Sequence, residues 1–299
     1  MQNEAPGSAT DGGKIMVNKE HKDRLFCFLF GREENRKWTL SLYNAVNGTG
    51  YTDPEEIEIT TISDAVYMGM KNDVAFLLHC HMSLYEHQST YNPNMPVREL
   101  MYLGKLYDKY IHAHTLNIYG KKIVPLPVPR LAVFYNGTEE HEDEVLRLSD
   151  AFPEGLDAAS SDVEVRVRMI NVNYGRNREL MEACRPLSEY TWFVEEIRRN
   201  RKDTGIEEAV DRAIDHMPED FEIKGFLVGN RAEVKDMCIT EYNEAETMQM
   251  FREEGREEGE DRLGELIKEL LSRGRISDAE RAAADKAARK GLYEEFGIV

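Results

Sequence analysis

Three polar residues, Asp73, Glu86 and Gln88, have the types and the spacing to bind a metal ion at the end of a β-hairpin. Asp73 opens a short apolar run, and Glu86 and Gln88 lie two residues apart at the end of the next run. Because side chains alternate between the two faces of a strand, Glu86 and Gln88 point to the same face. The midpoint between Asp73 and Glu86 falls between His79 and Cys80, so a symmetric hairpin turned there would place the two acids opposite each other.

Two carboxylates in that position need a positive charge between them. Directly opposed residues have Cβ atoms about 5 Å apart, and ionised carboxylates at such a distance repel each other. A hard divalent cation with oxygen ligands, Mg²⁺ or Mn²⁺, relieves this repulsion. The arrangement predicts the metal site of a phosphodiesterase. The alternative is that the hairpin is merely rich in acids and that Asp73 is a polar residue at a strand edge.

The periodicity of apolar residues predicts the elements that position these side chains. Alternation and short apolar runs indicate strands, and a proline suited to a first helical turn begins a helix between them. The predicted elements are a helical segment at 19–47, broken near Gly31; strands at 56–62, 73–78 and 83–89; a helix from Pro96 to about 114; and strands at 130–135 and 163–172. This order predicts a mixed sheet flanked by helices, with an acidic, solvated loop at 139–144.

The C-terminal third is predicted to be helical, at residues 187–199, 205–216, 245–271 and 277–296, the last as one short helix or a helix pair. The repeat REEGREEG at 252–259 is typical of a solvated helix, because acids and arginines four residues apart stabilise one another. Apolar residues at 263–271 form a stripe suited to packing against another helix. The stripe predicts either self-association into a homo-oligomer or packing back onto the chain's own domain.

Basic residues follow one face of the helix that begins at Pro96. Arg98, Tyr102, Lys105 and Lys109 lie near that face, at spacings of three and four residues. If the face meets the hairpin, Arg98 and Lys105 are candidates for binding phosphate, and Tyr102 is expected in the core. The alternative is a packing surface with a charged rim, because periodicity alone does not tell which face meets the hairpin.

The ordered set of motifs resembles the recombination-promoting nuclease (Rpn) and transposase family of the PD-(D/E)xK nuclease superfamily. The resemblance runs from about Lys22 to Gly137 and continues more weakly to the C-terminus. It is carried by KDRLFCFLFG at 22–31, Asp73-Val74, Glu86-His87-Gln88, the helical residues Arg98, Tyr102 and Tyr107, and PRLAVFYNG at 129–137. The family implies a restriction-endonuclease-like α/β/α core with a mixed central sheet, followed by a helical C-terminal region.

The same resemblance implies catalytic and metal-binding residues. Asp73, Glu86 and the backbone carbonyl of His87 would hold one Mg²⁺ or Mn²⁺, and Gln88 would position the attacking water. Gln88 stands where the superfamily usually has a lysine, and a neutral amide cannot stabilise a hydroxide by charge. The implied reaction is the hydrolysis of DNA phosphodiesters with little sequence preference, in recombination or in mobile elements.

The superfamily often adds an acid from its first helix to the metal site. Asp23 and Glu34 are the two candidates for this role. For Asp23 the alternative is an acid near a helix N-terminus, where the helix dipole favours negative charge.

The net charge of −18 is the main observation against a nucleic-acid role. A protein that neutralises phosphates needs lysine and arginine near them, so DNA binding requires a local basic strip on an acidic body. The candidates for such a strip are Arg98, Lys105, Lys109, Lys121, Lys122 and Arg130. The competing prediction is a catalytically degenerate nuclease fold that acts as a protein- or DNA-binding module.

The spacing of the cysteines and the length of the apolar runs limit which structural sites and which cellular location are expected. The four cysteines are widely spaced and form no CxxC pair, so neither a zinc site nor a disulfide framework is predicted. The apolar runs are too short to span a bilayer, and residues 1–19 lack the apolar core of a signal peptide, so we predict a cytoplasmic protein with no membrane partner. The predicted domains are a disordered tail at 1–19, a nuclease-like core at 20–185, a helical extension at 186–245 and a charged helix with a helical tail at 246–299.

Overall fold

The computed structural model describes residues 25–60, 73–153, 155 and 158–298. Within these ranges, the side chains of residue 73 and of residues 243–249, 251, 252 and 254 are not described. The tail predicted at 1–19 lies outside the described residues. The chain divides into two compact units, Met1–Ile239 and Thr240–Val299, and the first of them holds the sheet.

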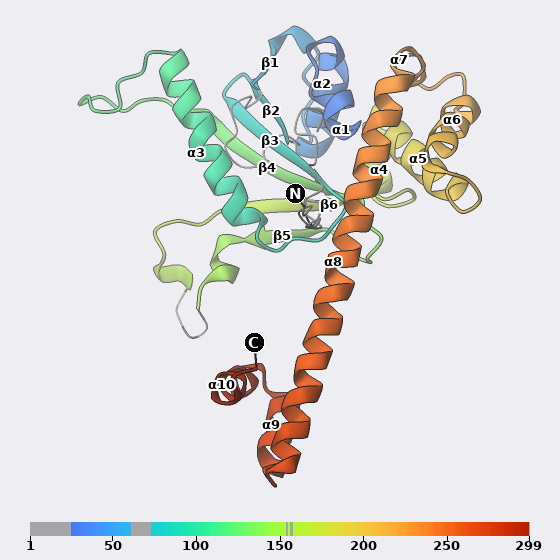
Figure 1. Ribbon diagram of the computed structural model, residues 1–299. Helices are drawn as coiled ribbons and strands as arrows, with labels where there is room; N and C mark the ends of the chain where they lie inside the picture. Colours follow the sequence, from blue (N-terminus) through green and yellow to red (C-terminus); the bar gives the residue numbers. More distant parts are fainter. Residues whose placement is uncertain (1–24, 61–72, 154, 156–157, 299) are drawn as a thin grey trace, which may run out of the picture. The chain divides into compact units, whose positions relative to one another are not determined.

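The first unit is built on a six-stranded sheet with the order β1-β2-β3-β4-β6-β5 (Figure 1). β3 is parallel to β4 and β4 is parallel to β6, whereas the other neighbours are antiparallel. The strands are β1 (Ile57–Ile59), β2 (Asp73–Leu78), β3 (His81–Gln88), β4 (Val128–Tyr135), β5 (Glu144–Arg147) and β6 (Arg166–Asn171). The predicted α/β class with a mixed sheet is therefore confirmed.

The helices of the first unit connect and cover these strands. They are α1 (Leu25–Phe30), α2 (Arg36–Asn47), α3 (Met95–Ala113), α4 (Arg178–Ala183), α5 (Arg185–Asn200), α6 (Ile206–His216) and α7 (Lys224–Gly229), with short 3₁₀ turns at Glu33–Asn35, Pro54–Glu56, Leu148–Ala151 and Ala158–Ser160. The break predicted near Gly31 is confirmed, since it lies between α1 and α2. The Thr39 hydroxyl donates a hydrogen bond to the Phe30 carbonyl at 2.6 Å, which satisfies an acceptor at the end of α1.

Alternation along the strands gives the sheet two apolar faces. On β3, Leu84 points to one face, where it belongs to a buried cluster with Tyr102 and Leu106 of α3. Tyr85 points to the other face, where a larger cluster joins the sheet to α1, α2, α5 and α6. Helices therefore cover both faces, and the first unit has three layers with the sheet in the middle (Figure 1).

Residues beyond 185 share the core of the first unit. Tyr190 and Phe193 of α5 and Val210 of α6 are buried in the same cluster as Phe26 of α1. The predicted helical extension, 186–245, lies in the first unit as far as Ile239, and this part packs with the predicted core.

The structure differs from the sequence prediction where elements are short or strongly polar. β5 begins at Glu144, the end of the segment predicted to be a solvated loop, and only Leu146 of its four residues is buried. Such a strand lacks the alternation by which strands are recognised. α4 and α7 are six residues each, too short to give a helical period. α8 (Arg231–Ser272) begins well before the predicted start at 245.

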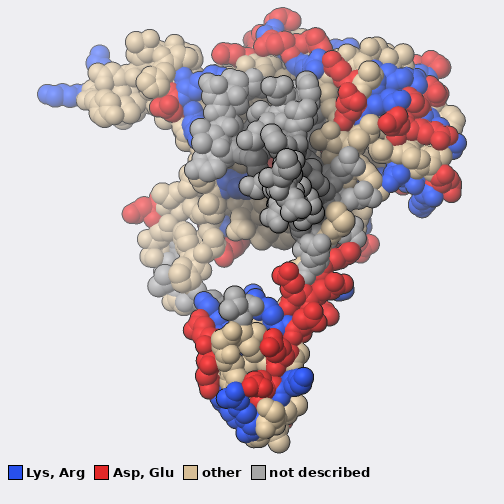
Figure 2. Space-filling model, viewed as in Figure 1, with Lys and Arg blue, Asp and Glu red and all other residues tan. Residues whose placement is uncertain are grey.

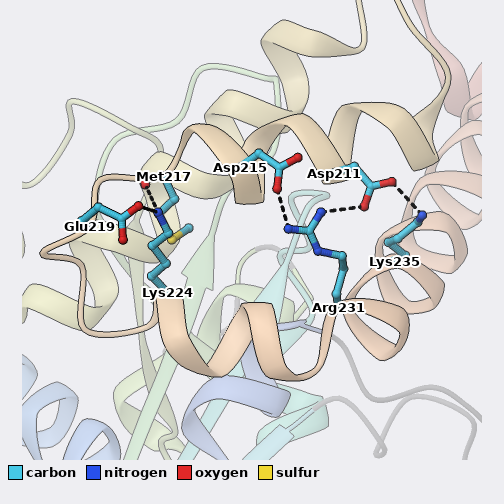
Figure 3. A network of polar contacts seen from close by, with 7 residues as sticks. All are labelled: Asp211, Asp215, Met217, Glu219, Lys224, Arg231 and Lys235. Carbon is cyan, nitrogen blue, oxygen red and sulfur yellow. Dashed lines mark hydrogen bonds and ion pairs between the residues drawn. The ribbon is translucent and has the colours of Figure 1, made fainter.

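A network of ion pairs ties the first turns of α8 to α6 (Figure 3). Arg231 donates to Asp211 at 3.2 Å and to Asp215 at 2.5 Å, and Lys235 donates to Asp211 at 2.8 Å. Asp211 and Asp215 are four residues apart, so one turn of α6 presents both carboxylates on the same side. The network thus fixes the start of α8 within the first unit.

Acid is expected to remove the stabilisation that Asp211 provides. The hydrogen bond from Lys235, with that from Arg231, holds the pKa of Asp211 below its ordinary value. Because the folded pKa is the lower one, the contribution is present above the unfolded pKa of about 3.9 and is lost as the pH falls through the folded pKa. Since Asp211 is 35% exposed, we expect Asp211→Asn to lower the free energy of unfolding by only about 1 kcal/mol at neutral pH.

Urea unfolding of the wild type and of Asp211→Asn, at neutral pH and near pH 3, measures this contribution. The difference between the two proteins should shrink toward zero at the lower pH. The exposed Asp203 provides a matched control, because Asp203→Asn removes the same charge from the surface. A difference for Asp211→Asn that is the same at both pH values would contradict the expected linkage.

The second unit continues α8 and adds α9 (Ile276–Ala284) and α10 (Lys286–Phe296). Leu266 and Leu270 of the predicted apolar stripe are fully buried, in a cluster with Ala282 of α9 and Leu292 of α10. The stripe therefore packs against helices of its own unit, and α9 and α10 confirm the helix pair at the C-terminus. Self-association through this helix stays a prediction.

Candidate functional site

The hairpin of β2 and β3 turns at His79 and Cys80, as the sequence predicts. The register continues from that turn until Asp73 lies opposite Glu86. His79 has a φ of 52°, in the left-handed region that tight two-residue hairpin turns use. The predicted opposition of the two acids is thus confirmed for the backbone, and the side chain of Asp73 lies outside the described residues.

Glu86 is a buried carboxylate that accepts two hydrogen bonds on one oxygen. Its side chain is 3% exposed, and its Oε1 accepts from Gln88 Nε2 at 2.7 Å and from Arg98 Nη2 at 2.6 Å. The contact with Gln88 confirms that these two residues of β3 share a face. The contact with Arg98 brings a positive charge to a carboxylate that would otherwise be costly to bury.

The first turns of α3 place Arg98 against the hairpin. Met95 and Pro96 open the helix, and the Met95 sulfur lies 2.9 Å from Gln88 Nε2. The Arg98 guanidinium donates from Nε and Nη2 to the Tyr102 hydroxyl, at 3.3 and 3.2 Å. The face of α3 that carries Arg98 and Tyr102 is therefore the one that meets the hairpin, and Tyr102 is buried as predicted.

His87 points to the opposite face of the sheet. Its side chain is 2% exposed, stacks on Phe26 with ring centres 5.2 Å apart, and has Nε2 2.9 Å from the Tyr190 hydroxyl. The His87 imidazole is thus directed toward α1 and α5, away from the Glu86 carboxylate. The role expected for the His87 backbone carbonyl stays a prediction.

Of the other residues predicted for the site, the structure describes Glu34 and Lys105. Glu34 lies in the 3₁₀ turn after α1, where its side chain is 60% exposed and pairs with Arg32 at 3.5 Å. Asp23 lies outside the described residues. Lys105 is partly buried on α3, two helical turns beyond Arg98.

One buried acid near the site escapes sequence reasoning. Glu99 follows Arg98 on α3, and its side chain is fully buried. A carboxylate is costly to bury, so Glu99, a second buried acid in addition to Glu86 of β3, is a functional signal. In the sequence Glu99 has the appearance of an ordinary helix-surface acid, because nothing in its neighbourhood reports which face is covered.

The donor set at the end of the hairpin fits a hard divalent cation by its chemistry. The carboxylates of Asp73 and Glu86 and the His87 carbonyl are oxygen ligands, which Mg²⁺ and Mn²⁺ prefer. The Arg98 guanidinium, 2.6 Å from Glu86 Oε1, holds the positive charge there in this structure. Among the described side chains, which do not include that of Asp73, no three acidic, histidine or cysteine residues converge as a metal site.

The fold and the site define a three-layered α/β protein with a buried acid–arginine–amide cluster at the end of its central hairpin. Comparison of the chain with protein-family models, with curated proteins and with solved structures finds no match. Within the described part of the chain, none of the helices is both long enough and apolar enough to cross a membrane.

Proposed function

We propose that this protein is a metal-dependent DNA endonuclease with low sequence preference, of the PD-(D/E)xK type and linked to recombination or mobile elements. The observation that carries the proposal is the β2–β3 register, which sets Asp73 opposite Glu86. The hydrogen bond between Gln88 and Glu86 supports it, because it joins the third expected residue to the pair. The three-layered unit around the mixed sheet is the setting that such a site requires.

Each residue of the site has a distinct part in the proposed reaction. Asp73, Glu86 and the His87 carbonyl would hold Mg²⁺ or Mn²⁺, which lowers the pKa of a bound water and offsets negative charge on the phosphate. Gln88 fixes the orientation of the Glu86 carboxylate through its amide nitrogen. The same amide would orient the attacking water.

Arg98 adds a second positive group beside Glu86. Its side chain is 28% exposed, so a phosphate in solvent can reach it while it is paired with Glu86. A guanidinium donates strong, charge-assisted hydrogen bonds to phosphate oxygens, which makes Arg98 the residue suited to bind the scissile phosphate. The Tyr102 hydroxyl, which accepts from Nε and Nη2, helps to hold the guanidinium in place.

A second candidate function is favoured by the same contact. The Glu86–Arg98 pair already neutralises the buried carboxylate, and Gln88 brings no charge for a hydroxide. With a net charge of −18, these features suit a degenerate nuclease fold that binds a protein or DNA without cleaving it.

Cleavage of supercoiled plasmid tests the proposal directly. The purified full chain is incubated with plasmid and Mg²⁺ or Mn²⁺, beside Glu86→Ala. Nicking or linearisation that the variant loses supports the nuclease, because Glu86 belongs to the proposed metal ligands. The same proteins and Asp73→Ala are then heated with and without metal. No cleavage by any protein, together with no metal-dependent shift in Tm, would favour the binding module.

A further inference from the structure

The loop between α3 and β4, residues 114–127, exposes large apolar side chains. Tyr119 is 93% exposed and Ile123 is 96% exposed, with Ile118 beside them at 53%. Figure 1 shows this loop extending past the end of α3 before it returns to β4. Single exposed apolar residues are ordinary, but a cluster on a projecting segment indicates a surface that contacts another molecule.

Local hydrogen bonds set the shape of this loop. The Asn117 side chain accepts from the Tyr119 amide at 3.0 Å, and the Asn117 carbonyl accepts from the Gly120 amide at 3.2 Å. At the return, the Tyr107 hydroxyl donates to the Pro127 carbonyl at 2.8 Å. The tip is therefore a formed turn that holds Tyr119 outward.

The charge of this region is opposite to that of the chain. Residues 105–130 contain five basic residues and one acidic residue, in a chain with a net charge of −18. Lys121 and Lys122 lie between the exposed Tyr119 and Ile123, and both lysines are exposed. Figure 2 shows basic and uncharged atoms together at the left extremity of the molecule, where the loop projects. Lysines beside an aromatic side chain suit phosphates and bases.

We propose that the α3–β4 loop is a DNA-binding arm, in which Lys121 and Lys122 neutralise phosphates and Tyr119 and Ile123 enter a groove of the duplex. The inference rests on the proposed function in taking DNA as the partner. Two adjacent lysines beside an exposed aromatic side chain suit a nucleic acid, which presents phosphates and bases together, whereas an acidic protein surface or a second copy of this chain would match the charge alone. A lipid surface is the remaining alternative, and the test includes it.

The arm lies at the far end of α3 from the hairpin site. Arg98 is in the first turns of the helix, and the loop begins after its last residue. Ala113 at the end of α3 is 15 residues beyond Arg98, which is a rise of about 22 Å at about 1.5 Å per residue. At about 3.4 Å per base pair, an arm that follows α3 along the duplex would meet it roughly seven base pairs from the phosphate at Arg98.

The test is the binding of a short fluorescent duplex to the full chain in EDTA, between about 50 and 200 mM salt. For Lys121→Ala/Lys122→Ala we expect the slope of log K against log salt to be shallower by about 1.8. The variant should bind more weakly than the wild type at about 50 mM salt, and this difference in affinity should shrink about tenfold by about 200 mM. Tyr119→Ala should weaken binding about tenfold at an unchanged slope. Lys286→Ala/Lys290→Ala removes the same charge from α10 and should bind as wild type.

Equal affinity and slope for the wild type and both loop variants would overturn the inference. So would binding to anionic phosphatidylserine vesicles that Tyr119→Ala abolishes while duplex binding is unchanged, which would assign the arm to a lipid surface. The plasmid assay separates the two proposals. If the loop variants weaken duplex binding and no plasmid is cleaved, the arm is supported and the nuclease is contradicted. If cleavage depends on Glu86 but duplex binding does not depend on the loop, the nuclease is supported and the arm is contradicted.

Discussion

Arg98→Met is expected to lower the free energy of unfolding by about 3 kcal/mol in EDTA, because it removes the guanidinium from a buried carboxylate. Glu86 is 3% exposed and accepts from Arg98 at 2.6 Å, so little water replaces the lost partner. The loss should be much smaller when Glu86→Gln is present as well, since the charge that needs compensation is then absent. Urea unfolding of the four proteins of this double-mutant cycle measures the coupling.

A divalent cation should restore much of this loss if the proposed site is correct. Mn²⁺ at a hundredfold excess over its Kd stabilises the folded state by about 2.7 kcal/mol. The shift should be larger in Arg98→Met than in the wild type, where the guanidinium competes for the same oxygen. Arg178→Met is the matched control. The side chains of Arg178 and Glu182 are both exposed, so this ion pair should contribute less than about 1 kcal/mol to the free energy of unfolding. An Arg98→Met protein as stable as this control would contradict the assigned pair.

Gly137→Ala is expected to destabilise the protein by about 3 kcal/mol and to disturb the candidate site. A Cβ at this position would meet the Ser89 carbonyl oxygen and the Tyr135 hydroxyl, and would lie 2.6 Å from Tyr135 Cζ. Relief requires movement of the chain after β3, where the Asn136 amide donates to the Gln88 carbonyl at 3.0 Å. Because a displacement of about 1 Å costs about 10²-fold in rate, cleavage should fall by about that factor.

Thermal unfolding and the plasmid assay measure the two effects of Gly137→Ala. Gly104→Ala is the opposite control, because Gly104 is inside α3 and an added Cβ meets no atom of the described chain within 4 Å. That substitution should raise the free energy of unfolding by about 1 kcal/mol, since alanine loses less backbone entropy in a helix. Equal stability of the two variants would show that the chain at the end of β3 shifts to accommodate the extra methyl group at little cost, and would contradict the prediction for Gly137→Ala.

The hairpin and its acid pair could be predicted because their causes are local. β2 and β3 are apolar runs separated by a two-residue turn, and the symmetry about His79 and Cys80 determines that Asp73 lies opposite Glu86. Alternation then places Gln88 on the face of Glu86. None of these steps requires knowledge of residues distant in the sequence.

The contacts that complete the site depend on packing between distant segments. The period of α3 shows that Arg98 and Tyr102 share a face, but the covering of that face is decided by the whole apolar cluster beneath the helix. Glu99 is buried for the same reason. β5 escaped prediction because its pairing with β6, and not its own sequence, makes it a strand.

Among the described strands, the two at the edges of the sheet are the shortest, and this bears on how the protein behaves when concentrated. β1 has three residues and β5 has four, so each edge offers few peptide groups to a neighbouring molecule. The exposed side chains of Glu58 and Arg147 place charge on these edges. Short, charged edges oppose the strand-by-strand growth that leads to amyloid. The long apolar strands β3 and β4 lie inside the sheet, so only unfolding would present them as templates for fibres.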